Sequence, residues 1–282
     1  MSMKSIIVMF MIAGCALADQ FADYWYAGLA EVAVYDLEQS RYGEPRDGTA
    51  TLIFVTEGFS KEKQVKLDYP ERAGEDKATV LKLNLVKKYN TGIYPYSIMM
   101  SSFAEVGSGL VLKATTSVQE WCGHVFMQAN HQEGADYRYQ GFSYFESEGD
   151  EQGTLTDTLL AEGLFSQIRL GQLEPGQYRI VPSQELARTL HFPLSAVPAT
   201  VSLQRDDEEM TYTISYDHPL QIQAEVVVST SFPHVVQSWS ESYTKGGQRE
   251  TSRATLKTVQ QLPYWNMNGP QYDKVRSEIG LE

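Results

Sequence analysis

Apolar and polar residues alternate along most of the chain beyond residue 30, as they do over residues 80–86 and 210–216. Successive side chains of a β-strand point to opposite faces of a sheet, so a period of two predicts half-buried strands. Turn-forming residues interrupt these runs at 44–48, 90–92 and 245–247, where each group predicts a reverse turn between two strands. The pattern therefore predicts a series of antiparallel hairpins.

About twelve strands are predicted, including residues 64–68 and 137–146, and that number exceeds the usual size of a sheet. Because strand twist accumulates, so large a sheet must curl, split or close. The predicted fold class is mainly β, with a large curved antiparallel sheet or half-barrel. Leucines and one isoleucine recur at three and four residues within 154–169, which favours a central helix, and residues 268–270 favour the start of a short C-terminal helix.

The N-terminus has the pattern of an export signal. Lys4 precedes an apolar run over residues 6–13, shorter than the roughly 20 residues of a membrane-spanning helix. Ile12-Ala13-Gly14-Cys15 resembles the lipobox of bacterial lipoproteins, in which the cysteine is acylated and becomes the first residue. The alternative is cleavage after Ala18, which would discard the cysteine and leave a soluble periplasmic protein. We predict an exported lipoprotein of the bacterial envelope, periplasmic or in the outer membrane, which lipid on Cys15 anchors to the membrane.

The domain organisation follows from these assignments. Residues 1–14 are predicted as signal peptide, residues 15–30 as a tether and the start of the domain, and residues 31–282 as a single β-rich domain. Strand-rich stretches lie on both sides of 154–177, so two similar halves meeting there are a further hypothesis, without a residue-level repeat to support it.

Charge and cysteine content narrow the partners. The chain has 23 Lys and Arg against 36 Asp and Glu, a net charge of −13, so we do not predict a nucleic acid partner. Its two cysteines are Cys15 and Cys122, and Cys15 lies in the signal, so no disulfide is predicted. The five histidines lack zinc-like spacing, and neither a metal nor another cofactor is predicted.

Residues 50–57, 87–97 and 119–124 resemble a family of exported bacterial lipoproteins whose members are often labelled "septum formation inhibitor Maf". The resemblance covers the first half of the chain clearly and the second half loosely. It implies an exported lipoprotein and carries no activity with it. True Maf proteins are cytoplasmic nucleotide pyrophosphatases with a Ser-Pro-Arg-Arg segment, and this sequence has neither that segment nor a glycine-rich phosphate loop. The sequence therefore excludes the pyrophosphatase activity.

The segment Trp121-Cys122-Gly123-His124 offers a thiol and an imidazole two residues apart. On a strand Cys122 and His124 would share a face, with Cβ atoms roughly 6 to 7 Å apart. One hypothesis is a cysteine-dependent hydrolase with Cys122 as nucleophile and His124 as base. The interpretation we favour is structural: Trp121 and Cys122 fill the core beside a bulge at Gly123, and His124 is hydrogen-bonded at the edge.

Aromatic residues are frequent, with 17 Tyr, 11 Phe and 4 Trp, and their rings suit either a concave ligand surface or cross-strand pairs within the sheet. The candidates for ligand contact are Trp25, Tyr94, Tyr96, Tyr139, Tyr144, Trp239 and Tyr243. The predicted function is that of a cell-envelope lipoprotein with a non-enzymatic binding or structural role. Its ligand would be a lipid or other hydrophobic molecule, a glycan or an envelope protein, and the alternative is the cysteine hydrolase.

Overall fold

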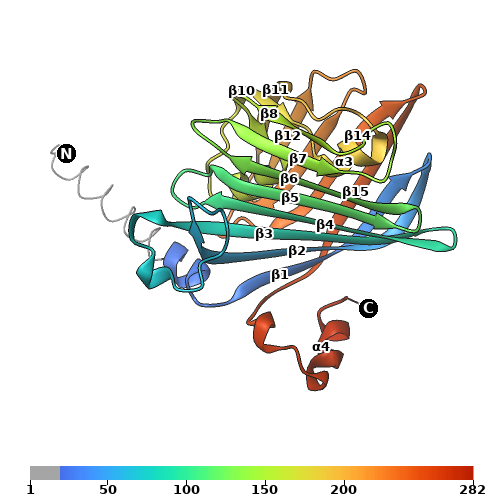
Figure 1. The fold of residues 1–282 in the computed structure, drawn as a ribbon. Coiled ribbons are helices and arrows are strands. Elements are labelled where there is room, and N and C mark those ends of the chain that lie inside the picture. Colours follow the sequence, from blue (N-terminus) through green and yellow to red (C-terminus); the bar gives the residue numbers. More distant parts are fainter. Residues whose placement is uncertain (1–19, 282) are drawn as a thin grey trace, which may run out of the picture.

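Fifteen strands join into one large curved, unclosed sheet in the computed structural model, which describes residues 20–281 (Figure 1). This arrangement confirms the mainly β prediction. The strands are β1 (Ala30–Arg41), β2 (Glu44–Ser60), β3 (Lys77–Thr91), β4 (Tyr94–Glu105), β5 (Val111–Glu120), β6 (Gly123–His131), β7 (Tyr137–Phe142), β8 (Glu151–Leu155), β9 (Leu159–Leu160), β10 (Gly176–Val181), β11 (Val197–Arg205), β12 (Glu209–Tyr216), β13 (Gln223–Ser229), β14 (Val236–Lys245) and β15 (Gln248–Leu262). The predicted signal peptide and Cys15 lie outside the described residues.

Strands that follow one another in the sequence are mostly neighbours in the sheet. The order is β8-β7-β6-β5-β4-β3-β2-β1-β15-β14-β13-β12-β11-β10-β9, so β1 and β15 pair in its middle while β8 and β9 form its edges. The described pairings are antiparallel except for that of β9 with β10, which is parallel. Leu155 of β8 and Leu160 of β9 belong to one core cluster, so the two edges approach each other across packed side chains.

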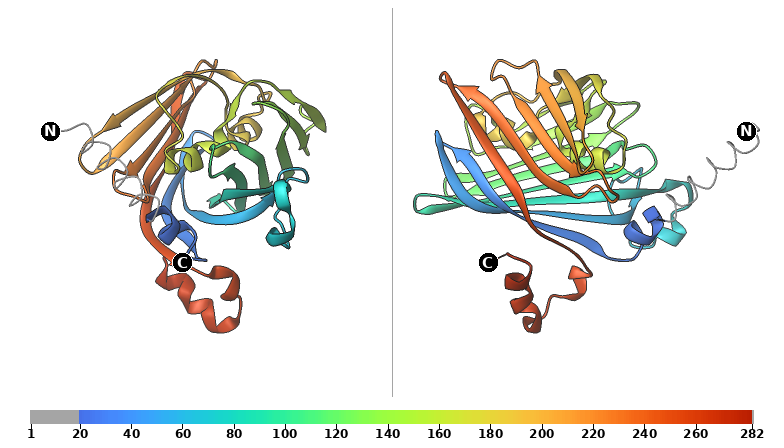
Figure 2. Two further views of the ribbon diagram at one scale, coloured as in Figure 1. Left: turned by 90° about the vertical axis from the view of Figure 1, so that its left-hand side faces the viewer. Right: turned by 180° about the vertical axis from the view of Figure 1, so that it is seen from behind.

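Three of the short helical elements lie inside the curve, and the C-terminal ones lie outside it (Figure 1). The helical elements are η1 (Pro70–Arg72), η2 (Gly74–Asp76), η3 (Ala161–Gly163), α2 (Leu164–Arg169), α3 (Gln184–Leu190), η4 (Tyr264–Asn266), η5 (Pro270–Tyr272) and α4 (Asp273–Glu278), and residues 20–25 are also helical. Of these, η3, α2 and α3 lie within the curved sheet (Figure 2); we call them the interior helices. Within residues 20–281 no helix has both the length and the apolar character needed to cross a membrane.

Polar contacts hold the interior helices to the strands and loops at both ends of the curved sheet. At the end near residue 20, the guanidinium of Arg169 donates to both carboxylate oxygens of Glu31, with Nη2 2.8 Å from Oε2. This pair is fully buried, and Arg169 lies 4.8 Å from the Trp25 ring and 4.6 Å from the Phe54 ring. Hydrogen bonding and ring contacts thus tie the last residue of α2 to β1 and β2.

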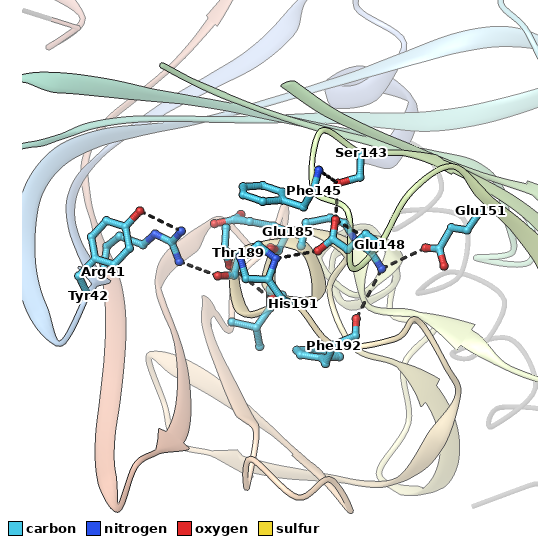
Figure 3. Close-up of polar contacts among 12 residues, drawn as sticks. Arg41, Tyr42, Ser143, Phe145, Glu148, Glu151, Glu185, Thr189, His191 and Phe192 are labelled. Carbon is cyan, nitrogen blue, oxygen red and sulfur yellow. Dashed lines mark hydrogen bonds and ion pairs between the residues drawn. The ribbon is translucent and has the colours of Figure 1, made fainter. Parts of the chain in front are cut away.

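At the opposite end, Arg188 of α3 pairs with Glu148 at 3.3 Å and with Glu151 at 3.1 Å (Figure 3). Nδ1 of His191 lies 2.8 Å from the same Glu148 carboxylate. Arg41 donates to the Thr189 carbonyl at 2.6 Å. These contacts hold α3 across the end of the interior.

Three local predictions are wrong. Only 164–169 of the helix predicted over 154–169 is α-helical, because Leu155, Leu159 and Leu160 face the core from strands although their spacing also fits a helix. The first hairpin turns at Tyr42 and Gly43, whose φ of 59° and 78° suit a two-residue turn, whereas 44–48 lies in β2. Residues 64–68 form only an isolated bridge rather than a strand. The predicted C-terminal helix is present as η5 and α4.

Candidate functional site

A cavity of about 80 Å³ lies inside the curved sheet, beside the interior helices. Strands β3, β4 and β5 form one side of its wall and β12, β13 and β14 form the other. Much of the lining is apolar, and includes Leu85, Met100, Phe165, Val226 and Trp239. Small-molecule sites are typically concave and apolar with a few polar groups that converge on the ligand, so this cavity is the principal candidate site.

Charged residues from five different elements line the cavity. Lys87 of β3 and Glu185 of α3 form an ion pair with Nζ 2.9 Å from Oε2, and both residues are less than a tenth exposed, at 4% and 8%. Glu162 of η3, Glu241 of β14 and the exposed Glu225 of β13 are three further glutamates in the lining. Because the ammonium of Lys87 already has Glu185 as its partner, the lining carries more acidic than basic groups.

Glu162 is held in the interior by one strong hydrogen bond and has one unpartnered oxygen. Its Oε1 accepts the Gln184 backbone N–H at 2.6 Å, whereas Oε2 has no hydrogen-bond partner among the described residues. The residue is only 3% exposed. Burial raises the pKa of the Glu162 carboxyl to about 7, with a further contribution from the nearby Glu241.

Glu241 lines the cavity from β14, and the pKa of its carboxyl is raised as that of Glu162 is. Burial raises the pKa of its carboxyl to about 7, and the Lys87 ammonium and the Ser183 hydroxyl only partly oppose that effect. Thr116 of β5 adds a hydroxyl that is 1% exposed and, like Oε2 of Glu162, lacks a partner among the described residues. The cavity therefore combines apolar walls with one buried and one half-buried carboxyl group, Glu162 and Glu241, whose charge changes near neutral pH.

Trp239 is the one predicted ligand-contact residue that lines this cavity. Its indole makes an edge-to-face contact with the Phe165 ring, with centroids 5.4 Å apart. Tyr243, on the same strand, is buried, and its hydroxyl donates to Glu250 at 2.9 Å. Among the cavity groups, sequence reasoning missed Lys87, Glu162, Glu185 and Glu241, which are far apart in the chain.

The other predicted aromatic residues are dispersed. Trp25 is buried beside Arg169, and Tyr96 is buried and stacked on Tyr89 with centroids 4.8 Å apart. Tyr139 is partly buried in β7. The structure does not bring these three residues to the cavity.

Tyr94 and Tyr144 belong instead to an exposed surface at the tips of the hairpins. Tyr42, Ile93, Trp121 and Tyr144 are 59%, 85%, 69% and 64% exposed. Tyr94 stacks on Trp121 with centroids 6.2 Å apart, and its hydroxyl lies 3.3 Å from that of Tyr42. Because successive strands run in opposite directions, these turns lie together at one end of the sheet, opposite residue 20 (Figure 1). We call these five residues the hairpin-tip surface.

The structural role predicted for Cys122 is wrong, because both Trp121 and Cys122 are exposed in the turn between β5 and β6. The Cys122 backbone N–H donates to the Glu120 carboxylate at 2.7 Å. The hydrogen bond and charge of Glu120 raise the pKa of the thiol. His124 is exposed in β6, where it pairs with Gln119. A raised thiol pKa lowers the fraction of thiolate, which is the opposite of what nucleophilic catalysis requires.

Within 20–281 there is no group of three or more His, Cys, Asp or Glu side chains placed to hold a metal ion.

Comparison with known proteins gives a likeness at the level of fold. No family model matches the chain, and no curated protein matches it. A crystal structure of a β-barrel-like protein of the domain of unknown function DUF1849, from Brucella abortus, is similar with a TM-score of 0.49 and 13% sequence identity. The alignment covers 83% of this chain and 98% of that one. The resemblance to exported lipoproteins stays a prediction.

Proposed function

We propose that this protein is a non-enzymatic binding protein that holds a small ligand in the cavity inside its curved sheet. The observation that carries the proposal is the lining, in which apolar walls surround two buried polar atoms, Glu162 Oε2 and Thr116 Oγ1, that lack partners within residues 20–281. A buried polar atom without a partner costs about 1–3 kcal/mol. A ligand that bonds to both atoms would recover part of that cost.

The volume of the cavity limits the size of the ligand. A cavity of about 150 Å³ admits a benzene ring, whereas this one measures about 80 Å³. A hexose or an acyl chain is larger than benzene, so neither fits the cavity in this conformation. The proposed ligand therefore has only a few non-hydrogen atoms, and it is smaller than the lipid or glycan predicted from the sequence.

A cavity-filling variant tests this proposal. Ala224 lines the cavity from β13, so Ala224→Leu places three further carbon atoms in it. Ala27→Leu makes the same change at an exposed position and serves as the matched control. Wild type and both variants are screened by NMR against small cations, alcohols and carboxylates. We expect saturable binding of at least one class to wild type and Ala27→Leu, and its loss in Ala224→Leu. Absence of saturable binding, or equal binding to Ala224→Leu, would refute an interior site.

We also propose that the protein is exported and anchored by lipid on Cys15, a proposal supported by the sequence Ile12-Ala13-Gly14-Cys15. Labelling cells with a palmitate analogue tests it. Wild type should take up the label and Cys15→Ser should not. An unlabelled wild type would favour cleavage after Ala18 and a soluble periplasmic protein.

The hairpin-tip surface supports a second candidate function, which is docking of an envelope protein. Exposed apolar surface of this kind marks interaction sites, and Trp and Tyr dominate the energy of protein interfaces. A photo-crosslinking amino acid at position 121 tests the surface in cells. Tyr69, which is 60% exposed in the connection between β2 and β3 at the other end of the sheet, provides the control position. We expect a discrete adduct from position 121 alone, and identical adducts from both positions would argue against docking.

A further inference from the structure

We infer that the ligand of the interior cavity is a small organic ammonium ion. The inference rests on the proposed interior binding site and specifies its ligand class. Four glutamates and one lysine, all from different elements, line the cavity. A ligand that satisfies this lining must supply positive charge at one end and apolar surface elsewhere.

The charges around the cavity favour a cation. Lys87 is paired with Glu185, which leaves the carboxyl groups of Glu162 and Glu241 without a basic partner of their own in the lining. A buried carboxylate is costly unless an opposite charge accompanies it. An anionic ligand would be repelled by the carboxyl groups of the lining, and a neutral ligand would leave their charge uncompensated.

The hydrogen-bonding groups favour an ammonium over a metal ion. Oε2 of Glu162 and the hydroxyl of Thr116 belong to residues that line the cavity, lack hydrogen-bond partners among the described residues and can each accept an N–H group. Trp239 adds an indole to the same lining, and indoles attract organic cations. Apolar residues such as Leu85 and Met100 complete the wall, where a metal ion would need oxygen or nitrogen ligands.

Binding of a cation should be coupled to ionisation of the two glutamates. Glu162 faces Glu241 on β14 and Glu185 on α3, and Tyr216 of β12 and Lys87 of β3 also contribute to the electrostatics of this region. Burial raises the pKa of both Glu162 and Glu241 to about 7, so each is partly protonated at neutral pH. A bound ammonium stabilises the ionised carboxylates, so binding releases protons and becomes tighter as pH rises from about 6 to about 8.

Water is the alternative occupant. At roughly 30 Å³ per molecule, a cavity of about 80 Å³ would hold two or three waters. Water satisfies the polar atoms but does not use the apolar walls, and its binding shows no preference for an added cation. The two occupants are therefore distinguished by titration.

A matched set of ligands tests the inference on the purified protein. Propylammonium, 1-propanol and propionate are nearly equal in size and differ in charge, and each is titrated at about pH 8 and constant ionic strength. A ligand of four non-hydrogen atoms binds no more tightly than about tens of micromolar, so the titration extends to tens of millimolar. We expect propylammonium to bind at least roughly tenfold more tightly than the other two, since a hydrogen bond to a charged group contributes that much.

Variants assign the effect to the two glutamates. Glu162→Gln and Glu241→Gln should each weaken propylammonium binding by roughly tenfold or more, whereas Glu38→Gln, at an exposed position of β1, should not change it. Calorimetry of wild type in buffers of different ionisation enthalpy should show proton release on binding, a readout that does not depend on any variant folding. If 1-propanol or propionate binds more tightly than propylammonium, and Ala224→Leu abolishes that binding, the ligand is not an ammonium ion. The interior binding site would still be supported. If none of the three ligands binds, the ammonium assignment is wrong. If the NMR screen of small cations, alcohols and carboxylates also finds no binding, the interior site itself is wrong.

Discussion

Replacing Glu162 by Gln should stabilise the protein at alkaline pH and leave its stability unchanged at acid pH. The folded state holds the Glu162 carboxyl with a pKa of about 7, compared with an ordinary value of 4.5. Between these two values the folded state binds a proton that the unfolded state has released. The free energy of unfolding therefore falls as pH rises from 4.5 to about 7 and levels off above it.

The magnitude follows from the same shift. The difference of 7 − 4.5 = 2.5 in pKa, at about 1.36 kcal/mol for each unit, corresponds to about 3 kcal/mol. Gln resembles the protonated carboxyl in shape and carries no charge, so Glu162→Gln avoids this cost. The variant should match wild type below pH 4.5 and exceed it by about 3 kcal/mol near pH 8, or roughly 6–12 °C in Tm for a domain of this size.

Urea unfolding at several pH values between about 4.5 and 8.5 measures the difference, with Glu38→Gln as an exposed control. Subtracting wild type from variant at each pH removes the contribution of the other acidic residues. A constant difference across the range, or a variant less stable than wild type near pH 8, would refute the argument that burial opposes ionisation of Glu162.

Three other predictions concern contacts outside the cavity. Arg169→Met should lower the free energy of unfolding by about 3–5 kcal/mol, because it leaves the buried Glu31 carboxylate unpaired; urea unfolding measures the loss, and a loss below about 1 kcal/mol would contradict it. Arg188→Met should increase hydrogen exchange in α3, because Arg188 joins α3 to the carboxylates of Glu148 and Glu151; unchanged exchange would show that packing alone holds the helix. Glu120→Gln should speed alkylation of Cys122 near pH 7.5, because it removes the carboxylate whose hydrogen bond and charge raise the thiol pKa; mass spectrometry after iodoacetamide treatment measures the rate, and a slower rate would contradict the assignment.

Much of the fold could be predicted because strand formation leaves a local pattern. Alternation and turn residues indicated the hairpin of β3 and β4 and that of β14 and β15 close to their observed bounds. The region between the two halves of the strand series was misread, since leucines at 155, 159 and 160 fit helical spacing and strand burial equally well. The helix α3 was missed, although Ser183 caps it by accepting the Leu186 backbone N–H at 3.1 Å.

The site was less predictable because it depends on tertiary contacts. Lys87, Glu162, Glu185 and Glu241 come together only when the interior helices fold into the curved sheet. In a chain with 36 acidic residues, no local pattern separates these glutamates from those on solvated strand faces. Only its aromatic character indicates Trp239 from the sequence, because its place in the cavity lining depends on the packing of β14 against α2.

An NMR titration of the four tryptophan indole N–H signals with propylammonium at about pH 8 tests the interior site most directly. Trp239 lines the cavity and Trp25 is buried elsewhere, whereas Trp121 and Trp265 are 69% and 42% exposed. Binding in the interior predicts that the Trp239 signal moves and saturates while those of Trp121 and Trp265 stay in place. Saturable movement of Trp121 or Trp265 with an unchanged Trp239 would contradict it.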